Sequence, residues 1–139
     1  MFSKSNLLAT LVATIVIFTL NIFLASIPPF QEFTKSHEIF PDGFVKEEPN
    51  FLLMLLTPIS WAFFLSTIYG MFKNEVHNFW KGFKFGFLFG LLVKFSTSLG
   101  DYSMFNKYDL TFTLTSGLLD IIVSGVVCGM IALIYKSNS

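Results

Sequence analysis

Apolar residues gather in four long runs along the chain, and each run is followed by a more polar segment. A membrane-spanning helix needs about 20 mostly apolar residues. Four windows meet this requirement: residues 6–27, 51–72, 78–99 and 112–135. The pattern predicts an all-α protein with one integral membrane domain over residues 1–139. We expect a four-helix transmembrane bundle with antiparallel, up-down connections and short loops.

The first run also has features of a secretory signal peptide, because Lys4 precedes the apolar stretch. Its apolar core is longer than that of a typical signal peptide, and no clear cleavage motif of small residues precedes Pro28. We therefore predict a retained span. Pro28 and Pro29 end this helix, since proline cannot continue a helical hydrogen-bond pattern.

Residues 28–50 form the one sizeable loop between predicted spans. Three phenylalanines in its first half, together with Ile39, are compatible with a short helix lying at the membrane surface: Phe30, Phe33 and Phe40. The interpretation that we favour for them is an aromatic belt at the membrane–water interface. The Pro41–Gly43 segment is a turn signal. His37, Glu38 and Asp42 lack a nearby second histidine or a cysteine, so we expect no metal site and no cofactor.

Lysine placement predicts the orientation of the spans, since cytoplasmic loops carry more positive charge. With the N-terminus inside, five lysines fall on the cytoplasmic side: Lys4, Lys73, Lys81, Lys84 and Lys136. Three fall outside: Lys35, Lys46 and Lys107. Both termini are thus expected in the cytoplasm, with the 28–50 loop outside. The layout resembles that of small four-span bacterial membrane proteins, which implies the inner (plasma) membrane.

Composition agrees with a membrane protein and argues against a soluble one. Hydrophobic residues make up 53% of the chain and charged residues 13%, whereas soluble domains have about 25% charged residues. The formal net charge is zero and no basic tract is present, so a nucleic-acid partner is not expected. Cys128 is the single cysteine, which excludes an intrachain disulfide.

Glycines at a stride of four mark one face of the third span. Gly82, Gly86 and Gly90 share this face because residues four apart are neighbours on a helix. Small residues allow helix backbones to approach closely in lipid. The fourth span has a matching stripe of Ser116, Asp120, Ser124, Cys128 and Ala132. All of these residues except Asp120 are small, and the adjacent edge carries Gly117, Gly125 and Gly129. Spans three and four are therefore predicted to pack together.

The same stride continues from Gly90 to Lys94 and then Ser98. One antiparallel register pairs Lys94 with Asp120 and aligns four further pairs: Gly90 with Ser124, Gly86 with Cys128, Gly82 with Ala132 and Ser98 with Ser116. A buried Lys94–Asp120 ion pair is the resulting hypothesis. The alternative is that Lys94 extends to the outer headgroups. Asp120 is too short to do so and requires a partner, a cavity or a proton.

Further polar residues fall at a similar depth and complete a candidate intramembrane polar site: Asn21, Thr57, Ser60, Lys94 and Asp120. Pro58 lacks the N–H that would bond the carbonyl of Met54, which leaves that carbonyl available. An ionisable residue in the membrane is a functional candidate by default. A structural polar cluster that holds the helices in register is the alternative.

No catalytic motif is present, and we expect no enzyme activity. Lys81 and Lys84 are expected at the cytoplasmic headgroups, and His77 is expected in an exposed turn.

The favoured function is a non-enzymatic accessory or scaffold subunit that associates with itself or another membrane protein. The alternative is a small transporter or channel for an ion, a proton or a small polar solute. A chain of this size is small for transport unless it dimerises.

Overall fold

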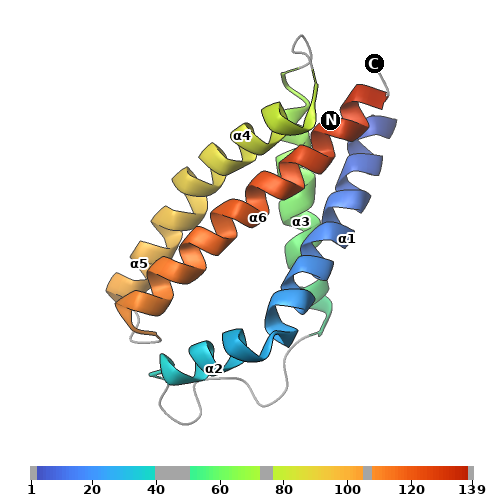
Figure 1. Ribbon diagram of the computed structural model, residues 1–139. Coiled ribbons are helices and arrows are strands. Elements are labelled where there is room, and N and C mark those ends of the chain that lie inside the picture. Colours follow the sequence, from blue (N-terminus) through green and yellow to red (C-terminus); the bar gives the residue numbers. More distant parts are fainter. Residues whose placement is uncertain (1–2, 40–50, 73–76, 105–107, 138–139) are drawn as a thin grey trace.

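The four apolar runs form four long helices in the computed structural model, which describes residues 3–39, 51–72, 77–104 and 108–137 (Figure 1). Within those ranges every regular element is helical, apart from an isolated bridge between Glu38 and Tyr108. The elements are α1 (Lys4–Ser26), α2 (Pro28–Ser36), α3 (Phe51–Tyr69), α4 (Phe79–Gly90), the π-helical turn η1 (Leu91–Phe95), α5 (Ser96–Met104) and α6 (Leu110–Ser137). The prediction of an all-α protein is confirmed.

Four stretches are long and apolar enough to cross a membrane, in line with the four predicted windows. They are Lys4–Ser26, Phe51–Tyr69, Phe79–Ser103 and Leu110–Lys136. The third consists of α4, η1 and α5 joined end to end. Two boundaries differ from the prediction by three residues or more, since the second stretch ends at Tyr69 rather than at residue 72 and the third reaches Ser103 rather than residue 99.

Polar side chains just before the helices fix where three of them begin. The side chains of Ser3, Asn78 and Asp109 each accept a hydrogen bond from the backbone N–H three residues further on. Such caps satisfy a donor that the first helical turn leaves open. α1 ends at Ser26 and α2 starts at Pro28, where a proline is tolerated because the first helical N–H has no partner within the helix.

α4 and α6 pack most closely, and the glycine stripe forms their contact. A Cβ atom built on each glycine would collide with α6 or press tightly against it. Gly82 would meet Cys128 and Ala132, Gly86 would meet Ser124 and Cys128, and Gly90 would meet Ile121 and Ser124. Later residues of α4 meet earlier residues of α6, so these two helices run in opposite directions. The predicted pairing of the three glycines with α6 is confirmed.

α1, α3 and α6 meet at the end of the molecule that holds both termini (Figure 1). The amide Nδ2 of Asn6 donates to Thr67 Oγ1 at 3.1 Å, and Ser66 Oγ donates to the Asn6 carbonyl. Tyr135 Oη of α6 donates to the carbonyl of Ser66 at 3.0 Å. Asn6 and Thr10 of α1 are both buried.

At the opposite end the α1–α3 pair diverges from α4, α5 and α6, and α2 runs across between them (Figure 1). The far end of α2 is fixed to the start of α6. His37 Nε2 lies 3.7 Å from Asp109 Oδ2, and the backbone N–H of Asp109 donates to the His37 carbonyl. The Phe33 ring stacks on Phe112. The first part of the loop thus contains a short helix, the alternative considered for it, over Pro28–Ser36, while the predicted Pro41–Gly43 turn lies outside the described residues.

Candidate functional site

The π-helical turn moves Lys94 away from the glycine stripe. In an α-helix the residue four positions after Gly90 would continue the stripe, but π-helical hydrogen bonds join residues five apart, so this turn holds an extra residue. Phe95 therefore takes the place facing α6, and its ring would lie 3.2 Å from a Cβ atom on Gly117. The prediction that Lys94 faces α6 is wrong, because it assumed an unbroken α-helix.

Lys94 instead places its charge over an aromatic ring of α3. Its Nζ atom lies 4.5 Å from the centre of the Trp61 ring, a geometry in which the ring attracts a cation. Among the residues that the structure describes, no carboxylate oxygen lies within 4.0 Å of this nitrogen. The predicted Lys94–Asp120 ion pair is therefore not formed, although the two groups remain close enough to interact electrostatically.

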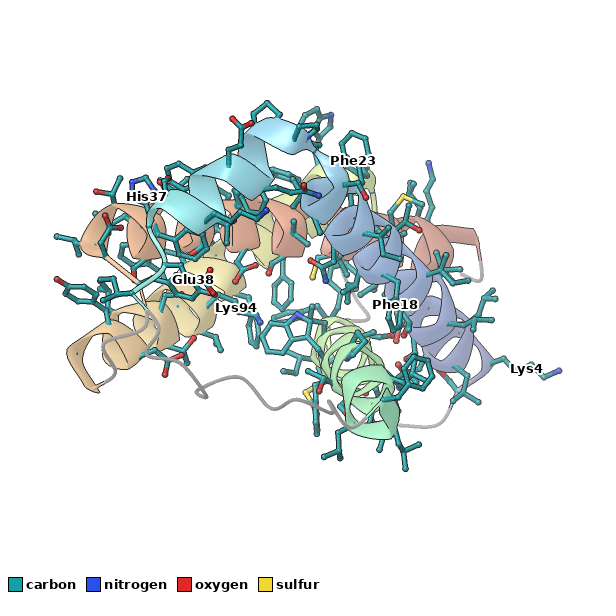
Figure 2. The ribbon with its side chains drawn as sticks, turned by 90° about the horizontal axis from the view of Figure 1, so that it is seen from below. Lys4, Phe18, Phe23, His37, Glu38 and Lys94 are labelled. Carbon is teal, nitrogen blue, oxygen red and sulfur yellow. The ribbon has the colours of Figure 1, made fainter. Side chains whose placement is uncertain are left out.

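Lys94 and Trp61 line an open groove of ≈ 540 Å³, which we call the lateral groove. Its walls come from three elements: Ile17, Phe18, Asn21, Ile22 and Ala25 of α1, Thr57, Pro58 and Trp61 of α3, and Lys94 of η1. Figure 2 shows Lys94 directed toward the region between α1 and α3. Asn21 and Thr57 are exposed on these walls, so the groove is open at the surface of the protein.

The predicted polar site is thereby divided. Asn21, Thr57 and Lys94 come together in the lateral groove, whereas Ser60 is exposed on α3 and does not line it. Asp120 is half-buried on α6, and its carboxylate has no hydrogen bond or ion pair within the described part of the chain. Thr57 donates to the carbonyl of Leu53. The functional role of all five residues stays a prediction.

A second cavity of ≈ 190 Å³ lies at the end where α2 meets α6. It is lined by Ser98, Asp101, Tyr102, Tyr108, Phe112, Thr113 and Ser116. Ser98 and Ser116, which the predicted register placed opposite each other, both line this cavity. Burial of the Tyr108 hydroxyl is the main effect that raises its pKa, and the negative charge of the nearby Glu38 carboxylate raises it further. Sequence reasoning missed Tyr108, whose position depends on the docking of α2 and not on a local motif.

The remaining glycines of the predicted packing surface receive aromatic rings of α4. A Cβ atom on Gly125 would lie 2.9 Å from the Phe83 ring, and one on Gly129 would lie 2.5 Å from the Phe79 ring. Cys128 is fully buried between the helices. These residues therefore serve close helix packing and leave no room for a bound group.

His77 is buried, contrary to the prediction of an exposed turn. Only 8% of its surface is accessible. Its Nδ1 lies 3.3 Å from Tyr69 Oη, and its ring packs against the rings of Tyr69 and Tyr135. The prediction failed because it used only the polar residues around His77, whereas two distant tyrosines enclose the ring.

The described residues contain no group of three or more His, Cys, Asp or Glu side chains placed to hold a metal ion. Of the three residues considered above as metal ligands, His37 faces Asp109, and Asp42 lies outside the described residues. Comparisons with protein-family models, with curated proteins and with solved structures found no match to this chain.

Proposed function

We propose that the protein is a non-enzymatic accessory or scaffold subunit that binds a copy of itself or another membrane protein. The observation that carries this proposal is how little of α3 is covered by the rest of the chain. In its most apolar stretch 18% of the residues are buried, which is close to 22% in α1 and 17% in the third span and well below 50% in α6. A helix that contacts its own chain along one narrow side has surface left for a partner.

The surface available for a partner contains a polar group. Leu53, Leu56, Ser60 and Phe64 follow one another at helical spacing and are all exposed; we call them the α3 outer face. Serine hydroxyls in membrane helices form hydrogen bonds to neighbouring helices, and small side chains permit close approach. Ser60 supplies both properties within an otherwise large and apolar face.

Cysteine cross-linking in native membranes tests this proposal. Replacing Cys128 by serine removes the only thiol, after which Ser60→Cys reports on the α3 outer face and Ile122→Cys on an exposed position of α6. We expect oxidation to link the Ser60→Cys protein to a second copy or to one defined membrane protein, while the Ile122→Cys protein stays monomeric. Equal cross-linking of the two variants, or none in either, contradicts the proposal.

We further propose that the four spans alternate in direction across a bacterial inner membrane, with both termini in the cytoplasm. The shared contacts of Asn6 and Tyr135 with Ser66 support termini on one side. Lys81 and Lys84 are exposed near the same end, where positive charge favours the cytoplasm. A Ser3→Cys variant should resist membrane-impermeant maleimide in intact cells and react in inverted vesicles. The opposite labelling reverses the orientation.

One observation favours the alternative function, transport of a proton or small solute. Asp120 lacks a partner within the described residues and lies one helical turn beyond Ser116, which lines the ≈ 190 Å³ cavity. Proton flux into liposomes that contain the purified protein tests this alternative. Flux that disappears in Asp120→Asn favours transport, and absence of flux in the wild-type protein excludes proton transport.

A further inference from the structure

The lateral groove has the composition of a ligand site. Its volume of ≈ 540 Å³ lies within the range of about 300–1,000 Å³ that is usual for small-molecule sites. Most of its wall is apolar, with Ile17, Phe18 and Pro58 among the lining residues, and a few polar groups converge on it. Such a site suits a molecule with a long apolar part and one polar end.

The charge of that polar end follows from Lys94. This side chain is half-buried, and its ammonium contacts the Trp61 ring rather than an acid. Within the described ranges no ion pair of 4.0 Å or less compensates the charge, and Asp120 acts on it only from a greater distance. A cation surrounded by apolar groups is costly unless an anion accompanies it. A ligand that complements Lys94 in this groove would therefore be anionic.

The dimensions of the groove favour a lipid over a protein segment. The lining part of α1 extends from Ile17 to Ala25, which is about 12 Å at ~1.5 Å per residue. A transmembrane partner helix would need a track roughly 30 Å long. Ala25 is next to the last residue of α1, so the groove reaches the point where this helix leaves the apolar run and a headgroup can enter.

We propose that the lateral groove binds one anionic phospholipid, with the phosphate at Lys94 and an acyl chain against Phe18 and Trp61. Asn21 and Thr57 are within the same groove and provide hydrogen-bonding groups for the headgroup. The site is built within a single chain. This inference therefore stands independently of the proposed subunit role and of the α3 outer face.

Native mass spectrometry of the purified full-length protein in a non-ionic detergent tests the proposal. Phosphatidylglycerol is titrated against phosphatidylcholine, which shares the phosphate but has no net charge. We expect phosphatidylglycerol to bind the wild-type protein about tenfold or more tightly than phosphatidylcholine, because a charge-assisted contact is strengthened in an apolar site. Equal binding of the two lipids overturns the proposal.

Three lysine variants and one pair of phenylalanine variants locate the site. Lys94→Met should lose the preference for phosphatidylglycerol and Lys94→Arg should keep it, while Lys84→Met, at an exposed lysine of α4, leaves it unchanged. Ala25→Phe fills the groove without altering a charge and should also abolish binding, whereas Ser26→Phe, at an exposed neighbour outside the groove, should not. Undiminished binding in both Lys94→Met and Ala25→Phe overturns the proposal.

The source of the anion is distinguished by competition. Inorganic phosphate and glycerol phosphate carry the headgroup charge without a chain, and we expect neither to displace phosphatidylglycerol at a hundredfold excess. Displacement by either one shows a site for a free anion and contradicts the lipid assignment. Should Lys94→Met fail to fold, the Ala25→Phe and Ser26→Phe pair still decides the outcome, since both retain the lysine.

Discussion

The ammonium of Lys94 lies 4.5 Å from the centre of the Trp61 ring, although Asp120 is near enough for an electrostatic interaction. The π-helical turn explains this arrangement, because its additional residue rotates Lys94 from α6 toward α3. Phe95 and Ser98 then approach Gly117 in its place. Turns of this type occur frequently at functional sites, which agrees with the lateral groove at this position.

The glycine contact between α4 and α6 predicts a large difference between two glycine-to-alanine substitutions. A Cβ atom on Gly86 would lie 2.6 Å from Cys128 Cβ, whereas one on Gly100 would meet no neighbouring atom of the described residues within 4 Å. Gly86→Ala should destabilise the protein by about 1–3 kcal/mol, as overpacked cores do. Gly100→Ala should leave stability unchanged or slightly raised. Urea unfolding in non-ionic detergent measures both, and equal effects contradict the packing described.

The extra residue of the π-helical turn predicts that one deletion is tolerated. Removing Leu92, which is 71% exposed, converts the turn into α-helix and leaves Phe95 facing α6. Removing Leu88, which is 59% exposed, rotates Gly90 off the contact instead. The second deletion should destabilise the folded protein by about 1–3 kcal/mol more than the first, because it disturbs the packing of α4 on α6. Similar losses from the two deletions, measured by thermal unfolding, argue against the turn.

The contact of α2 with α6 predicts different effects for two substitutions of Asp109. Its Oδ1 accepts the Phe112 N–H at the start of α6, and its Oδ2 faces His37. Asp109→Ala loses both interactions, and loss of the helix cap alone should destabilise the protein by about 1 kcal/mol. Asp109→Asn keeps the cap and should be closer to the wild type. Hydrogen exchange of α2 should accelerate in both variants; unchanged exchange means that Asp109 does not hold α2.

The burial of His77 predicts unequal chemical modification of the two histidines in the chain. His37 has a quarter of its side-chain surface accessible, while His77 is enclosed by Tyr69 and Tyr135. Diethylpyrocarbonate should therefore modify His37 faster, as followed by mass spectrometry of peptides. Tyr69→Phe removes the hydroxyl partner and should accelerate modification of His77 alone. Faster modification of His77 than His37 in the wild type supports the exposed turn instead.

The sequence predicted those features that depend on local helical periodicity. The four spans follow from the length of the apolar runs, and the contacts of Gly82, Gly86 and Gly90 follow from the stride of an α-helix. Lys94 and His77 were misplaced for different reasons. Neither the sequence around Lys94 nor its spacing indicates an extra residue in the turn, and His77 depends on residues of two distant helices.

A comparison of two double-mutant cycles tests the central claim most directly, that Lys94 interacts with Trp61 and not primarily with Asp120. One cycle combines Lys94→Met with Trp61→Leu, and the other combines Lys94→Met with Asp120→Asn. Unfolding free energies in a non-ionic detergent without added lipid give the two coupling energies. We predict about 0.5–2 kcal/mol for Lys94–Trp61, the range of cation–π contacts, and a smaller value for Lys94–Asp120. A Lys94–Asp120 coupling that equals or exceeds the Lys94–Trp61 coupling would contradict the account.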